Sequence, residues 1–134
     1  MKILCPTGHL SFTPLEQDSF LAGCEKGPDV IVADAGSSDV GPRGLGANAQ
    51  VSPSQWQRQD LEVMLLQARR LGIPMIVGSA SDAGTDKGVD HFVSLIRAIV
   101  QEHDLPPFTV AAIYSEVPIS HLKQRVEAGE RIEG

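Results

Sequence analysis

The sequence predicts an α/β fold: a three-layer α/β/α sandwich of the Rossmann or flavodoxin type, with a parallel sheet of about four strands. Four short apolar segments rich in β-branched residues alternate with four segments of helical periodicity. Connections that contain a helix make neighbouring strands parallel, and a parallel sheet is normally covered on both faces. With 134 residues, of which 42% are hydrophobic, the chain is expected to form a single α/β domain over residues 1–134.

The first predicted strand covers residues 2–6, and a helix signal follows it. Thr13 is expected to be the N-cap, with Pro14 at the first helical position and Glu16 three residues after the cap. The second predicted strand, residues 30–33, is an apolar run without polar alternation. Such a run is typical of a strand buried on both faces.

The second predicted helix begins with the same pattern, in which Ser52 is the cap and Pro53 the first helical residue, and it ends at Gly72. Residues 73–77 form the third predicted strand, and the small polar residues 78–84 are expected to be a loop. The order of elements so far is strand, helix, strand, helix, strand.

The last part of the chain is expected to add a third helix over residues 86–103, a fourth strand over 108–113 and a final helix over 119–128. The third helix has the strongest apolar stripe of the chain. Residues 44–51 are small and aperiodic, which predicts a long connection, and long connections are more often functional than idle.

The carboxyl ends of parallel strands share one edge of the sheet, where α/β proteins bind ligands. Four small or polar loops are expected to meet there: residues 7–9, 34–39, 78–82 and 114–116. The candidate catalytic residues are Asp34, Asp39, Glu116 and His9, and the candidate ligand-binding residues are Thr7, Gly8, Gly36, Ser37, Ser38, Gly78, Ser79 and Tyr114. The alternative is that these residues only form turns and caps after core strands.

Each candidate has a chemical reason. Asp34 or Glu116 is expected to act as a base toward an acidic C–H bond or a water molecule. His9 is expected to move protons near neutral pH, unless it is a loop histidine bonded to backbone. The loops at Ser37 and Ser79 are expected to hold an anionic group through backbone amides. The three histidines on predicted helices, at 91, 103 and 121, are given no role.

No motif requires a cofactor, because the sequence has no dinucleotide loop, no Walker-type Gly-Lys-Ser, no nucleophile elbow and no histidine pair with metal spacing. The carboxylates leave room for a divalent cation, Mg²⁺ or Mn²⁺ rather than zinc. A net charge of -6 argues against nucleic acid as a partner. Without an apolar run near ~18 residues, no membrane association is expected. Cys5 and Cys24 are expected to be free thiols in a reducing, cytoplasmic compartment.

Four segments carry a resemblance to a known family: Cys-Pro-Thr-Gly-His-Leu at 5–10, residues 27–42, Leu45-Gly46, and Ile-Val-Gly-Ser-Ala at 76–80. They resemble the acyclic terpene utilisation (AtuA-like) family, and the likeness runs over the whole of this chain. The most specific part is Asp-Ala-Gly-Ser-Ser-Asp at 34–39, followed by Gly-Pro and Leu-Gly. The family has proline where this chain has Val40, and bulkier residues where it has Arg43 and Gly44, a difference that leaves room for another ligand.

Members of that family are considerably longer than this chain, which corresponds to their N-terminal portion. The resemblance implies part of a longer protein, or one subunit of a split enzyme. It implies a catabolic enzyme acting on a carboxylate or an acyl-CoA compound by lyase, hydratase or isomerase chemistry, as a homo-oligomer or with a second subunit that carries the rest. Two alternatives stay open: a non-catalytic subunit or assembly module completed by a partner chain, and a small nucleotide-binding domain.

Overall fold

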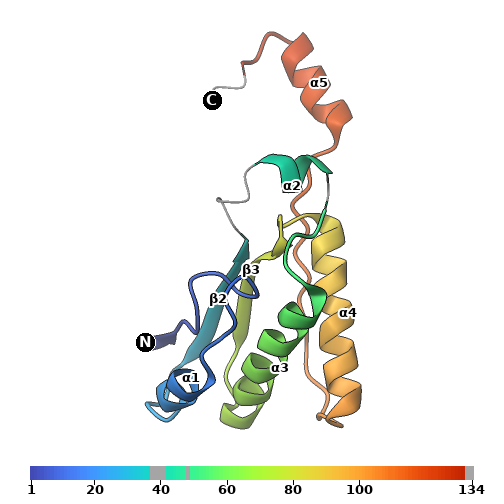
Figure 1. The fold of residues 1–134 in the computed structure, drawn as a ribbon. Helices are drawn as coiled ribbons and strands as arrows, with labels where there is room; N and C mark the ends of the chain where they lie inside the picture. The colour runs from blue at the N-terminus through green and yellow to red at the C-terminus, as the bar shows by residue number, and fades with distance from the viewer. Residues whose placement is uncertain (37–41, 48, 132–134) are drawn as a thin grey trace.

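A small parallel sheet is the centre of the protein, whose computed structural model describes residues 1–36, 42–47 and 49–131. Its strands are β1 (Ile3–Leu4), β2 (Val30–Gly36) and β3 (Met75–Asp82), in the order β1-β2-β3 (Figure 1). In the register, Ile3 is opposite Val30, and Asp34 is opposite Gly78. The predicted α/β class and the parallel direction of the strands are therefore confirmed.

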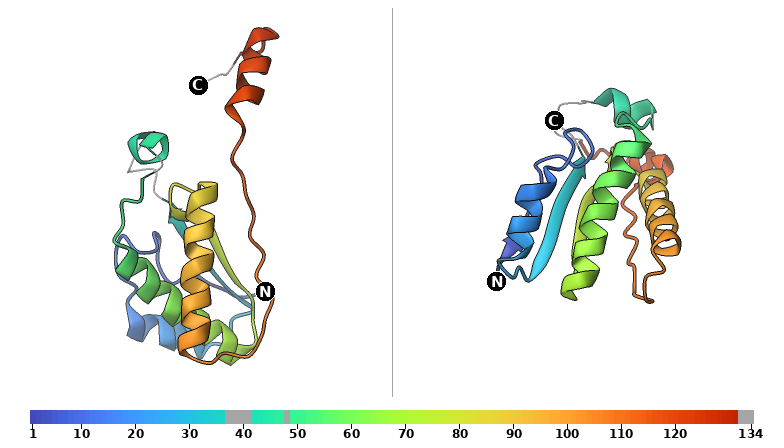
Figure 2. Two further views of the ribbon diagram at one scale, coloured as in Figure 1. Left: turned by 90° about the vertical axis from the view of Figure 1, so that its right-hand side faces the viewer. Right: turned by 60° about the horizontal axis from the view of Figure 1, so that its bottom comes forward.

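Three helices pack together on one face of this sheet: α1 (Gln17–Cys24), α3 (Ser54–Leu71) and α4 (Asp86–Glu102) (Figure 2). Every second residue of β2 points toward them and is buried, namely Ile31, Ala33 and Ala35. The remaining members of this hydrophobic core are Leu10, Phe20, Cys24, Leu61, Met64, Leu65, Ala68, Phe92 and Ile99. Burial of this one cluster holds the three helices on the sheet.

The predicted third layer is not found in the described residues, and the reason lies in the strand order. Strands that follow one another in one direction, joined by right-handed crossovers, place every crossover helix on the same face. A second helical layer needs a reversal of strand order, which β1-β2-β3 does not contain. The opposite face is accordingly open to solvent, with Ile3 58% and Ile76 54% exposed.

The predicted fourth strand is also absent: residues 108–113 pair with none of the described strands. This segment runs back along the body in an extended form after α4 (Figure 1). Its first residue, Phe108, packs against the core, and the guanidinium carbon of Arg69 lies 4.7 Å from the centre of its ring. Residues 109–131 are exposed throughout.

The remaining helices, α2 (Pro42–Ala47) and α5 (Ile119–Glu127), lie beyond the edge at which β2 and β3 end (Figure 1). α2 falls partly within the predicted aperiodic connection at 44–51. α4 and α5 agree with their predicted ranges to within one residue at each end. None of the helices in the described ranges combines the length and apolar character that a bilayer crossing requires.

The first helix begins later than predicted, because Glu16 is its N-cap in place of Thr13. The Glu16 carboxylate accepts hydrogen bonds from the backbone N–H groups of Asp18 and Ser19. The pKa of Glu16 is lowered, most of all by a side-chain hydrogen bond from Ser19 and then by these two backbone hydrogen bonds. The preceding segment is held elsewhere, since the Leu15 N–H donates to the buried Asp60 carboxylate at 3.1 Å.

The second predicted cap is also wrong, since α3 begins at Ser54 and the Ser52 hydroxyl donates to Asp82. The third strand is displaced along the chain: it runs from Met75 to Asp82, so most of the predicted loop is strand. Residue 73 is not part of the strand. It follows the left-handed Gly72 that ends α3, and its N–H donates to the Ala68 carbonyl.

Candidate functional site

The ends of β2 and β3 bring four of the predicted site residues together. Asp34 and Gly78 are opposite each other in the register, and the Asp34 Oδ1 accepts the Gly36 N–H at 2.9 Å. A Cβ atom at Gly36 would lie 2.3 Å from the Ser79 Cβ, so only glycine fits there. Asp34 is exposed, which leaves this carboxylate accessible to a ligand.

The loop after β1 joins the same edge through the backbone. The Leu10 N–H donates to the Asp34 carbonyl at 2.8 Å, and the His9 N–H donates to the Thr7 hydroxyl at 3.4 Å. Gly8 lies between Thr7 and His9, and a Cβ atom there would meet nothing within 4 Å. Three further predicted residues, Thr7, Gly8 and His9, are therefore neighbours of the Asp34 strand end.

The His9 ring is directed toward Asp82 and stacks on Phe12, with ring centres 5.1 Å apart. Its Nε2 lies 3.8 Å from the Asp82 Oδ1, beyond hydrogen-bond distance. This nitrogen is buried and has no hydrogen-bond partner among the described residues. The predicted proton carrier therefore lies in the interior of this edge, next to the buried Asp82 carboxylate.

Asp82 organises this region more than any other residue. Its carboxylate accepts from the N–H groups of Val51 and Ser52, both at 2.9 Å, and from the Ser52 hydroxyl, with the Gln57 amide 3.4 Å away. Asp82 is only 6% exposed. With both oxygens engaged, the carboxylate ties residues 51–52 to the end of β3 and is a structural anchor.

The end of β3 has an unusual backbone. Ser79, Ser81 and Asp82 all have positive φ angles, of 49°, 58° and 69°. The β2–β3 register shifts at the same place, between Asp34 and Gly36. Each left-handed non-glycine residue costs about 1–3 kcal/mol, and such strain concentrates at ligand sites.

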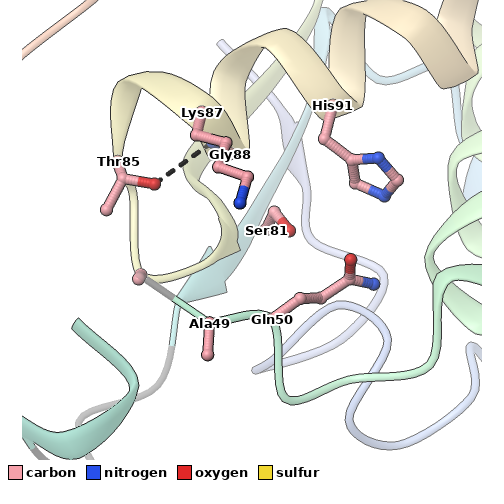
Figure 3. Close-up of a pocket in the computed structure, with 8 residues that line it drawn as sticks. Ala49, Gln50, Ser81, Thr85, Lys87, Gly88 and His91 are labelled. Carbon is pink, nitrogen blue, oxygen red and sulfur yellow. Dashed lines mark hydrogen bonds between the residues drawn. The ribbon is translucent and has the colours of Figure 1, made fainter. Parts of the chain in front are cut away.

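A hollow of about 150 Å³ lies beside this strained segment, between the end of β3, the first turns of α4 and residues 49–50 (Figure 3). The residues lining it are Ala49, Gln50, Ser81, Ala83, Thr85, Lys87, Gly88 and His91. No carboxylate is among them, and Lys87 extends its ammonium group toward the hollow (Figure 3). The hollow is therefore suited to an anionic group.

Local packing fixes the hollow in place. The Thr85 hydroxyl caps α4 by accepting the Gly88 N–H at 3.1 Å. A Cβ atom at Gly88 would lie 2.3 Å from the Ala80 carbonyl oxygen, so glycine lets α4 approach β3 closely. The His91 Nε2 is 3.1 Å from the Gln57 amide oxygen, which orients the ring.

Glu116 and Tyr114 reach the same end of the molecule by a different route. The Glu116 carboxylate accepts the Asp86 N–H at 3.0 Å, and the Asp86 carboxylate accepts the Ser115 and Glu116 N–H groups at 3.2 Å. Tyr114 donates to Asp90 at 2.6 Å, and this hydrogen bond raises the pKa of the Tyr114 hydroxyl. Both side chains thus fasten residues 114–116 to the first turns of α4.

The remaining predicted site residues, Ser37, Ser38 and Asp39, lie outside the described residues. Sequence reasoning missed Lys87 and His91, which are one helical turn apart on α4. The available signal was their position just after a loop of small residues, on a helix whose apolar residues fall elsewhere. Ser81 was placed within a predicted site loop, but its left-handed backbone could not be read from its residue type.

A second polar cluster lies toward the other end of α4. Donor atoms of Glu62, Glu102 and His103 fall within 4.8 Å of one another, a spacing compatible with a metal ion. Arg58 bonds to both carboxylates, and the His103 Nε2 lies 2.6 Å from the Glu62 carboxylate. These contacts account for the cluster as an ion-pair network that joins α3 to α4.

The fold and the edge described above define an α/β protein with a small parallel sheet and a hollow at the carboxyl end of β3. Comparisons with the models of known protein families, with curated proteins and with solved structures each gave no match. The resemblance to the acyclic terpene utilisation family therefore stays a prediction from the sequence segments that carry it.

Proposed function

We propose that this chain is the ligand-binding part of a catabolic enzyme that acts on a small carboxylate or an acyl-CoA compound. The observation that carries the proposal is the hollow itself, in which Lys87 faces an opening without a lining carboxylate. The ammonium group and the hydroxyl groups of Ser81 and Thr85 supply polar contacts for an anion.

The size of the hollow narrows the ligand. A cavity of about 150 Å³ holds a molecule the size of benzene, so it accepts a carboxylate with a short carbon chain. A complete CoA thioester is far larger. We propose that the acyl end of such a compound enters the hollow while the nucleotide end remains outside.

The reaction that we propose is acid–base chemistry of the lyase, hydratase or isomerase type. In this proposal Lys87 holds the anionic group in the hollow, and Asp34, the exposed carboxylate at the strand ends, acts as base on a part of the ligand that lies outside the hollow. His9 lies nearby at Asp82 and supplies a second titratable group. The proposal includes a cytoplasmic location, in keeping with Cys5 and Cys24, which are both free thiols.

Calorimetric titration of short-chain carboxylates and acyl-CoA esters into the protein tests the proposal. We expect saturable binding that the Lys87→Met substitution weakens by about tenfold or more, since it removes a charge-assisted hydrogen bond. Lys26→Met, an exposed lysine at the end of α1, is the matched control and should leave binding unchanged. Equal affinity in the Lys87 and Lys26 variants, or no binding to any carboxylate or ester, would contradict the proposal.

A second candidate is the assembly module completed by another chain. The open face of the sheet and the exposed segment 109–131 favour it. This candidate would be supported over the enzyme if the chain binds a partner protein but shows no measurable affinity for carboxylates, CoA esters or nucleotides in the same titrations.

A further inference from the structure

One face of the sheet presents apolar side chains to solvent. Val32 and Ile76 are opposite each other in the β2–β3 register, and Ile3 belongs to the same face through its pairing with Val30. Ile3 and Ile76 are more than half exposed, Val32 is half-buried, and Val30 on the same face is 8% exposed. We call Ile3, Val32 and Ile76 the bare face. In a parallel sheet such a face is normally covered.

The same chain has a helix without a partner. α5 has no buried residue, and its apolar residues Ile119, Leu122 and Val126 are 70%, 42% and 52% exposed. Their spacing of three and four residues places them in one stripe. Figure 1 shows α5 projecting beyond the body, and we call the exposed residues 109–131 the C-terminal arm.

The total surface shows how much of this chain is left uncovered. A compact monomer of 14.3 kDa exposes about 6,800 Å². This chain exposes 8710 Å², an excess of about 1,900 Å² over that expectation. Two chains together would carry an excess of about 3,800 Å², within the range of about 2,000–5,000 Å² that permanent homodimers bury.

α5 cannot cover the bare face of its own chain as long as residues 114–116 remain bonded to α4. Residues 114–116 are fastened to Asp86 and Asp90 on the side of α4. From Glu116 to Ile119 the chain advances at most about 11 Å. Helices on opposite faces of one sheet have axes roughly 20 Å apart.

We infer that two copies of this chain exchange their α5 helices, while residues 114–116 stay on their own α4, so that the apolar stripe of α5 from each copy covers the bare face of the other. One two-fold contact then satisfies both unpartnered surfaces, and exchange of an identical element is a common route to dimers. Lys123 flanks the stripe of α5, and the exposed Asp34 borders the bare face, so these two charges are complementary. The inference is independent of the ligand proposed above.

Sedimentation velocity of the full chain at micromolar concentration tests the inference, and a dimer is expected. The double substitution Leu122→Asp and Val126→Asp should raise the dimer dissociation constant by about a hundredfold or more, because it places charges in the apolar contact. Gln124→Asp adds the same charge on the polar side of α5 and should leave the dimer intact. A wild-type monomer, or a dimer that the double substitution does not weaken, would overturn the inference.

A cross-linking experiment identifies the two surfaces. With the exposed Cys5 replaced by serine, a chain carrying Ile76→Cys is mixed with a chain carrying Leu122→Cys. We expect a disulfide between the two different chains under mild oxidation. If a chain that carries both cysteines closes the disulfide within itself, or if the mixed pair never forms, the exchange is wrong. α5 has no buried residue, so the Leu122 variant is expected to fold and tests the interface even if the Ile76 variant fails to fold.

Discussion

At the scale of single residues, two buried carboxylates do most of the positioning. Asp60 accepts the N–H groups of Ser11 at 2.9 Å and Leu15 at 3.1 Å, and so fixes the segment that leads into α1. Asp82 does the same for residues 51–52 at the other side of the candidate site. Neither role could be predicted, because a sequence does not reveal which distant N–H groups a carboxylate meets in the folded chain.

Asp60 makes the stability depend on pH. Desolvation raises its pKa above the usual 3.8, and the two backbone hydrogen bonds only partly oppose this effect. The folded state therefore binds this proton more tightly than the unfolded state, so the contribution of Asp60 to stability falls as pH rises through the window above 3.8. Urea unfolding of wild type and Asp60→Asn across that window should show wild type gaining relative to the variant as pH is lowered. A difference that is constant with pH would contradict this expectation.

Gly88 is the residue at which α4 and β3 come closest. We expect Gly88→Ala to lower the free energy of unfolding by about 1–3 kcal/mol, because its Cβ would overlap the Ala80 carbonyl oxygen and force α4 away from the strand. Gly46→Ala, where a Cβ meets nothing within 4 Å, is the control and should cost nothing. Chemical denaturation measures both, and equal stabilities would show that α4 does not pack as closely as described.

At the scale of elements, the ranges of α4 and α5 were predicted to within one residue at each end, whereas the starts of α1 and α3 were not. The stripe of α4 marks its extent to within one residue of the observed end. The two proline-based caps failed because Asp60 binds the backbone of Leu15, two residues after Thr13, and Asp82 binds Ser52 itself. Local sequence patterns show which residues are able to cap a helix, but tertiary hydrogen bonds determined the conformation of these two segments.

The cap of α4 offers a direct test of this difference. Thr85→Ala should lower the free energy of unfolding by about 1 kcal/mol, because the Gly88 N–H loses its side-chain acceptor. Thr85→Ser keeps the hydroxyl and should remain close to wild type. Thr13→Ala, at the cap that the sequence predicted for α1, should have little effect, since Glu16 occupies that role. Thermal unfolding of the three variants gives the comparison, and a larger loss at Thr13 than at Thr85 would reverse the assignment.

At the scale of the whole molecule, the alternation of strands and helices was enough to predict the α/β class and the shared edge of strand ends. It was not enough to predict the layers, because these depend on the order of strands across the sheet. The described candidate residues on the first three strand ends do lie at that edge, namely Thr7, Gly8, His9, Asp34, Gly36, Gly78 and Ser79. Lys87 and His91 come from the following helix, and only the close approach of α4 to β3 brings them to the hollow.

The one-directional strand order has a consequence for how such a chain can change in evolution. Because β1, β2 and β3 are added in sequence toward one side, a further strand next to β3 would disturb none of the existing pairings. The extended residues 108–113 already have the conformation that such an addition needs (Figure 1). A few substitutions there could enlarge the sheet by one strand, whereas an addition beside β1 would require the chain to cross the whole body.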